Sequence, residues 1–139
     1  MTTNTTALKS LIGELDRNLR LCDGVIAGAH WRLVEDISAR RARAAATLRA
    51  VLRWYGETMP PRRTRPDADG ATVGDLVAAD ADLIRAYNRA CAVADADAPE
   101  ARLVEEQRRI ALRDRERLRE QMAPVSSTAS AGAAASVAR

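Results

Sequence analysis

The strongest constraint on this chain is a spacing that recurs in four segments, where bulky apolar residues follow one another at intervals of three and four. Such a spacing places apolar side chains on one face of an α-helix. The four segments cover approximately residues 5–28, 31–55, 72–94 and 97–122. Four helices with one apolar face each bury those faces most economically against one another. The sequence therefore predicts an all-α, antiparallel four-helix bundle.

Composition also favours helices over a sheet. The 139-residue chain contains no Phe and only 3% aromatic residues, whereas Ala, Leu, Arg and Glu, which favour helices, are abundant. A chain of this length forms one domain as a rule. We expect residues 1–124 to form the bundle and residues 125–139, which are rich in Ala and Ser, to be a disordered tail.

Turn and capping residues set the expected helix ends. Pro60 and Pro61 stop the second segment, because proline lacks the backbone N–H that a helix interior needs. Thr72 and Asp75 have the spacing of a capping box at the start of the third segment. Residues 57–71 would then form a long loop between the second and third helices.

Several protein classes are disfavoured. The sequence has no run of about 18 apolar residues that could cross a membrane, and its N-terminus lacks the basic and apolar pattern of a secretory signal. Cys22 and Cys91 both fall on apolar helical faces. We expect two buried free thiols in a reducing cytoplasm rather than a disulfide.

Charge is unevenly distributed, although the formal net charge is only +3. Residues 31–65 hold nine Arg and three acids, a sum of +6, whereas residues 66–100 hold two Arg and eight acids, a sum of −6. The favoured interpretation is that the second and third helices pair electrostatically, within the bundle or between subunits. The alternative is a basic patch for nucleic acid, and its candidate residues are Arg40, Arg41, Arg43, Arg62, Arg63 and Arg65.

Three of the apolar faces carry a charged residue near the middle of the helix, namely Arg41, Asp80 and Asp114. If the helices align by their centres, these residues lie in one layer, and burial of a charge demands a partner. A guanidinium can serve two carboxylates. The sequence predicts a polar core of Arg41 with Asp80, Asp114 or both, with Gln107 and Asn18 completing the hydrogen bonds. In the alternative, a small helix rotation leaves one or more of the charges at the solvated rim.

The same layer is where di-iron helical bundles hold their metal. Such a site uses a Glu from each of two helices and Glu-x-x-His from each of the other two. The sequence contains no Glu-x-x-His, and its only histidine, His30, lies between the first two helical segments. It also lacks a Gly-rich phosphate loop, a Cys-x-x-Cys pair and a nucleophile elbow. We therefore expect no cofactor, no metal site and no catalytic residues.

Several short motifs together are similar to those of a known family, in their order and spacing over residues 7–122. They are Leu11–Leu15, Arg41–Leu48 followed by Tyr55-Gly56-Glu57, Asp80 with Arg85-Ala-Tyr87, Glu106-Gln107, and Arg115–Leu118. The pattern resembles a bacterial family of ferritin-like four-helix bundles of unknown function. The resemblance implies that fold, a dimer and a cytoplasmic setting, but no established activity. Ala39 and Arg115 stand where that family often has Glu and His, so metal binding is not carried over.

Three functions follow from these observations. The favoured one is a non-enzymatic bundle that acts through self-association or through binding of another protein. The second is a metal-binding or di-metal ferritin-like protein, which would rest on fold analogy alone. The third is a weak binder of nucleic acid or of an anionic surface through the arginine-rich second helix and loop.

Overall fold

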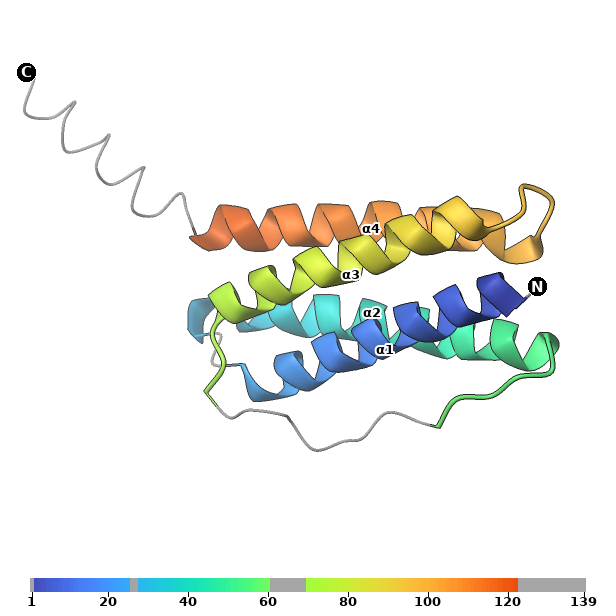
Figure 1. The fold of residues 1–139 in the computed structure, drawn as a ribbon. Coiled ribbons are helices and arrows are strands. Elements are labelled where there is room, and N and C mark those ends of the chain that lie inside the picture. Colours follow the sequence, from blue (N-terminus) through green and yellow to red (C-terminus); the bar gives the residue numbers. More distant parts are fainter. Residues whose placement is uncertain (1, 26–27, 61–69, 123–139) are drawn as a thin grey trace, which may run out of the picture.

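A computed structural model describes residues 2–25, 28–60 and 70–122. These residues form four α-helices and one short 3-10 turn (Figure 1): α1 (Thr2–Gly24), η1 (Gly28–His30), α2 (Trp31–Trp54), α3 (Val73–Val93) and α4 (Pro99–Met122). One isolated bridge, between Val25 and Ala71, is the only β-type pairing within the described ranges. The predicted all-α class is confirmed.

Contacts near the helix ends fix the chain directions. The start of α1 lies beside the end of α2, because Lys9 Nζ is 2.6 Å from Glu57 Oε1. The end of α1 lies beside the start of α3, because the Gly70 N–H donates to the Gly24 carbonyl at 3.1 Å. The helices α2 and α3 therefore both run opposite to α1 and in the same direction as each other (Figure 1). The end of α2 and the start of α3 consequently lie at opposite ends of the molecule.

The interior is almost entirely aliphatic. Tyr87 on α3 is the largest of the fully buried side chains. The others are mostly Leu and Ile from all four helices: Leu11, Ile12, Leu15, Leu19, Ile37, Leu48, Leu52, Leu76, Leu83 and Leu118. Burying an aliphatic side chain of this size contributes about 1.5–3 kcal/mol, so these residues supply much of the driving force for folding.

Two positions show which of two adjacent apolar residues faces the core. Leu83 on α3 and Val104 on α4 are buried, whereas the adjacent Ile84 and Leu103 are only partly buried against the same core. Adjacent residues lie about 100° apart around the helix axis, so one of each pair is turned away from the centre of the core. Met122 at the end of α4 is 46% exposed.

The ends of α2 and α3 follow local capping rules. Gly56 has a φ of +81°, and the N–H groups of Gly56 and Glu57 donate to carbonyls of the last turn of α2, as in a Schellman motif. The predicted capping box is present, because Thr72 Oγ1 accepts from the Asp75 N–H at 3.1 Å and Asp75 Oδ2 accepts from the Thr72 N–H at 2.9 Å. Most of the expected loop, residues 61–69, and the expected tail, residues 125–139, lie outside the described residues.

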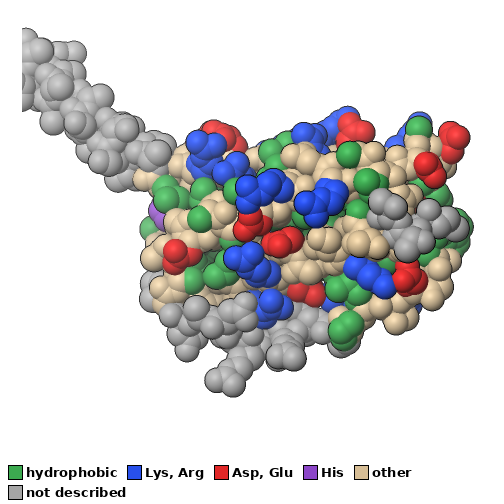
Figure 2. Space-filling view, viewed as in Figure 1, with side chains coloured by type: hydrophobic (Ala, Val, Ile, Leu, Met, Phe, Trp, Pro, Cys, Tyr) green, Lys and Arg blue, Asp and Glu red, His purple; other side chains and the backbone are tan. Residues whose placement is uncertain are grey.

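The face of the molecule in Figure 2 mixes charges of both signs with scattered apolar side chains. Over the described ranges, none of the helices combines the length and the apolarity that a membrane span requires. The large apolar side chains that remain exposed are Trp31, Trp54, Leu112 and Met122. Both tryptophans of the chain are therefore at the surface, one at each end of α2.

Candidate functional site: a layer of ion pairs beside an open seam

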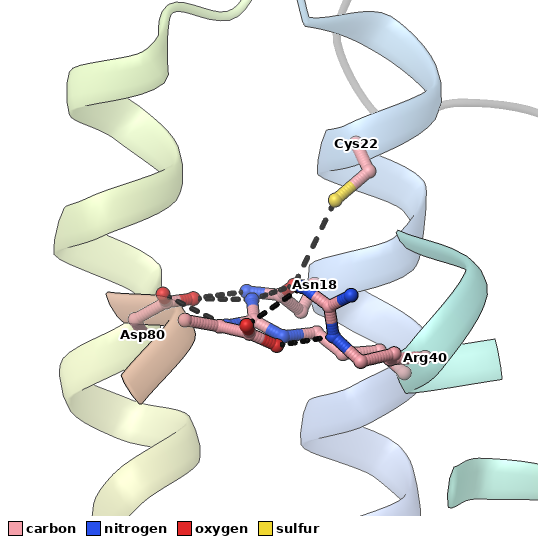
Figure 3. A network of polar contacts seen from close by, with 6 residues as sticks. Asn18, Cys22, Arg40 and Asp80 are labelled. Atoms are coloured by element: carbon pink, nitrogen blue, oxygen red, sulfur yellow. Dashed lines mark hydrogen bonds and ion pairs between the residues drawn. The ribbon is translucent and has the colours of Figure 1, made fainter. Parts of the chain in front are cut away.

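A buried polar layer joins α1, α2 and α3 at mid-height (Figure 3). The Arg41 guanidinium on α2 donates from Nη1 and Nη2 to the two carboxylate oxygens of Asp80 on α3, at 2.6 and 3.0 Å. Asn18 on α1 donates to Asp80 at 2.7 Å and accepts from Arg41 at 2.5 Å. Arg41 is 3% exposed, Asp80 is 0% exposed and Asn18 is 1% exposed. The expected contacts among these three residues are all present.

Asp114 on α4 has a different partner from the one expected. Arg40 donates to it from Nε at 3.1 Å and from Nη2 at 2.7 Å, and this hydrogen bonding raises the pKa of the Arg40 guanidinium. Arg40 and Arg41 are consecutive, so their side chains leave α2 about 100° apart and reach different helices. One guanidinium does not bridge both carboxylates, and each carboxylate has its own arginine.

Gln107 does not take part in the arginine network. Its Oε1 accepts a hydrogen bond from the Tyr87 hydroxyl at 3.1 Å, and its Nε2 donates to the Ala44 carbonyl at 3.5 Å. Tyr87 is buried, and desolvation raises its pKa. Gln107 therefore supplies the acceptor that a buried phenol needs, rather than completing the Arg41 cluster.

A third buried carboxylate was missed by the sequence analysis. Asp16 on α1 accepts two hydrogen bonds from Arg49 on α2, at 3.2 and 2.5 Å, and Arg49 also donates to the Pro60 carbonyl at 2.8 Å. Both residues directly follow a core leucine, Leu15 and Leu48, so they sit beside the apolar face rather than on it. An acid and an arginine that each directly follow a core leucine are the sequence pattern that would have predicted this pair.

The second helix therefore gives one arginine to each of its three neighbours. Asp16 of α1, Asp80 of α3 and Asp114 of α4 are all buried, and each forms a two-fold hydrogen-bonded pair with an arginine of α2. The charge sums had favoured α3 as the complement of α2. Only one of these three pairs, Arg41–Asp80, joins α2 to α3.

The start of α4 is tied to the end of α2 by a second unpredicted contact. The Tyr55 hydroxyl lies 2.7 and 2.8 Å from the two carboxylate oxygens of Glu100, which is 2% exposed. Glu100 lies in the first turn of α4, where the helix dipole favours a negative charge. The hydrogen bond to Glu100, with a smaller contribution from burial, raises the pKa of Tyr55 to about 12.

The candidate basic patch is only partly represented. Arg40 and Arg41 are held by carboxylates, whereas Arg43 is exposed and has no ion-pair partner among the described residues. Arg62, Arg63 and Arg65 lie outside the described residues.

Potential metal ligands do not gather in the part of the chain that the structure describes. No group of three or more His, Cys, Asp or Glu residues is placed there to hold an ion. His30 ends η1 and is partly exposed, as a residue of the junction between α1 and α2. Cys22 and Cys91 form no disulfide, but only Cys22 is buried, so the expectation of two buried thiols is wrong for Cys91. Partial burial raises the pKa of the Cys91 thiol.

A cavity of about 270 Å³ opens beside the polar layer, between α2 and α4. We call it the α2–α4 seam. The helix α2 lines it with Arg40, Arg41, Arg43, Ala44 and Thr47. The facing helix α4 lines it with Gln107, Ile110, Ala111 and Asp114, and α3 adds Tyr87. Ala44 and Ala111 are the small residues at the centre of the two helix faces, and they leave part of the space between the helices open.

Comparisons with protein-family models, with curated proteins and with solved structures find no match to this chain.

Replacement of Arg41 by Leu tests the polar layer. The variant leaves the buried Asp80 carboxylate without its guanidinium, and breaking a buried pair in this way costs about 3–5 kcal/mol of unfolding free energy. Chemical denaturation followed by circular dichroism measures the loss. Arg43→Leu, which removes an unpaired exposed arginine, should change stability by about 0.5 kcal/mol or less.

The double variant Arg41→Leu/Asp80→Leu separates a lost charge pair from lost packing. Replacing a whole buried pair with apolar residues is often neutral or stabilising, so this variant should recover most of the loss. An Arg41→Leu protein that melts at the wild-type temperature would show that the pair is not needed.

Tyr55→Phe tests the contact between α2 and α4. Removing the hydroxyl leaves buried Glu100 without this donor, which should lower stability by about 1–3 kcal/mol at pH 8. Tyr55 has a raised pKa in the folded state, so its stabilising contribution is complete below about pH 10, the ordinary tyrosine pKa. That contribution is lost as the pH rises toward about 12. The stability difference between wild type and Tyr55→Phe should therefore shrink over this range.

Trp54→Phe is the control for this titration, because it changes the neighbouring side chain without touching Glu100. Its stability difference from wild type should not vary with pH. A Tyr55→Phe difference that is equally independent of pH would contradict the assigned hydrogen bond.

Proposed function

We propose that this chain is a ferritin-like antiparallel bundle that acts by association, with a second copy of itself or with another protein, and that performs no metal-dependent or catalytic chemistry. The polar layer is the observation that carries the proposal. At the level where di-iron bundles use carboxylates and histidines from four helices, Asp80 and Asp114 are each bound by a guanidinium through two hydrogen bonds. A cation entering there would have to displace an arginine that the fold itself holds in place.

The chain directions support the ferritin-like arrangement. The end of α2 and the start of α3 lie at opposite ends of the molecule, although α3 is the next described α-helix after α2. Ferritin-like bundles differ from simple up-and-down bundles in having two consecutive helices placed in this way. The unbridged Cys22 and Cys91 support a reducing compartment such as the cytoplasm.

The exposed tryptophans support association. Trp31 is 53% exposed and Trp54 is 69% exposed, in a chain that has no other tryptophan and no Phe. Tryptophan is enriched at protein interfaces and at their energetically dominant positions. Trp54 is the more exposed of the two and packs edge-on against Tyr55, with ring centroids 5.0 Å apart. We place Trp54 in the interface.

The other two functions receive less support from the described residues. A metal-binding role would need ligands beyond the two arginine-bound carboxylates of the layer. A nucleic-acid role would need free arginines, and Arg40 and Arg41 are neutralised by Asp114 and Asp80.

A native mass spectrum of the untagged protein tests both parts of the proposal at once. We expect the mass of a homodimer, or of a complex with a co-purified protein, and no stoichiometric metal. Iron, manganese or copper bound at one or two ions per chain would contradict the assignment of the polar layer. A protein that remains monomeric and unpartnered at every concentration would contradict the association.

Fluorescence of single-tryptophan variants tests the place of the interface. In Trp31→Phe only Trp54 emits, and its emission should shift to shorter wavelength as dilute protein is concentrated, because association removes the indole from water. In the matched variant Trp54→Phe, the emission of Trp31 should stay constant and the dimer should weaken. Emission that is independent of protein concentration in both variants would show that Trp54 does not lie in the interface.

A further inference from the structure

We propose that the α2–α4 seam binds a small organic monocarboxylate with an apolar body. This inference goes beyond the proposed function, because it assigns a ligand class to a cavity that association does not require. It rests on the shape of the seam, on its apolar walls and on one positive charge that no described residue neutralises.

The shape of the seam follows from the residues that face each other across it. On α2 the facing residues are spaced as 40, 43, 44 and 47, and on α4 as 107, 110, 111 and 114, which is one helical face in each case. Ala44 and Ala111 stand opposite one another at the centre. The helices α2 and α4 therefore contact each other through fewer residues than the pairs α1–α2, α1–α3 and α3–α4 do.

The walls of the seam are mainly apolar. Ala44, Ile110, Ala111 and Tyr87 provide them, and most of the lining surface is carbon. Small-molecule sites typically combine such walls with a few polar groups that fix the orientation of the ligand. A volume of about 270 Å³ equals that of roughly nine waters at about 30 Å³ each, which suits a ligand of about ten non-hydrogen atoms.

The charged residues that line the seam, together with Asp80 behind its lining, favour the binding of an anion. Arg40 is neutralised by Asp114, and Arg41 is neutralised by Asp80, which stands behind the lining. Arg43 lines the seam, is exposed and has no acid partner in the described ranges. The three arginines and two carboxylates named here therefore sum to +1, and the unpaired charge of Arg43 matches one carboxylate.

Two further observations favour a carboxylate at this place. The guanidinium fork of Arg43 suits a carboxylate, because both groups are planar and pair through two parallel hydrogen bonds. The buried Nε–H of Arg41 has no acceptor among the described residues, so added negative charge nearby is electrostatically favourable. The ligand carboxylate would lie at Arg43, at the mouth, and the apolar body would lie over Ala44 and Ile110.

Titration with sodium octanoate, which has ten non-hydrogen atoms, tests the proposal. We expect saturable binding of one octanoate per chain to the untagged full-length protein, with a Kd of about 0.1–1 mM by calorimetry. The neutral analogue 1-octanol should bind at least about tenfold more weakly, and the cationic analogue octylammonium should not bind. Equal affinity for octanoate and 1-octanol would show that the carboxylate charge of the ligand does not contribute to binding.

Matched variants locate the site without disturbing the ion pairs. Arg43→Gln should weaken octanoate binding at least about tenfold, whereas Arg53→Gln, an exposed arginine of α2 outside the seam, should leave binding unchanged. Ala44→Leu should fill the seam and abolish binding, whereas Ala42→Leu, on the exposed side of α2, should not. All four proteins should retain their helical circular dichroism, and unchanged binding by Arg43→Gln or Ala44→Leu would overturn the proposal.

The oligomeric state of the same variants separates this inference from the proposed function. If octanoate does not bind and Ala44→Leu dissociates the dimer, the seam is covered by a second copy, and the ligand site is overturned while association stands. If octanoate binds to a protein that is monomeric and unpartnered, the ligand site stands and association fails.

Discussion

The pairing of Arg41 with Asp80 is the interaction on which the arrangement of the helices depends. Aliphatic side chains provide most of the burial, but they tolerate small shifts along and around a helix. A two-fold hydrogen-bonded pair, with Asn18 closing the triangle, permits one relative height for α1, α2 and α3. Both charges are fully desolvated, so their separation in any other packing would leave a charge without a partner. The pair therefore acts mainly by excluding alternative registers.

The position of α2 in the bundle explains why the seam exists. Three of its arginines form ion pairs with carboxylates on α1, α3 and α4, and these contacts hold α2 at fixed distances from the other helices. Toward α4, the contact is made at Asp114 near mid-height and at Glu100 near one end. Between those two ties Gln107 donates to the Ala44 carbonyl, and Ala44 and Ala111 are too small to fill the remaining space. The cavity is thus a consequence of small side chains that lie between polar contacts.

The sequence was sufficient for the helices and for part of the polar layer. Apolar spacing located all four helices, and the capping residues located the start of α3, because both are local properties. The partners of Asp114 and Asp16 could not be predicted, since they depend on the rotation of each helix about its axis. The same rotation decides between Leu83 and Ile84. The burial of Glu100 could not be predicted either, because its partner Tyr55 is 45 residues away in the chain.

One helix, α2, provides the arginines for three buried carboxylates, and this has a consequence for how the protein opens. If α2 frays or swings away, the carboxylates of all three neighbours lose their partners in the same event. The free energy of such an opening therefore includes lost contacts on all four helices rather than on one helix. Amide hydrogens deep in α1, α3 and α4 would then exchange with solvent at a common rate, set by the departure of α2.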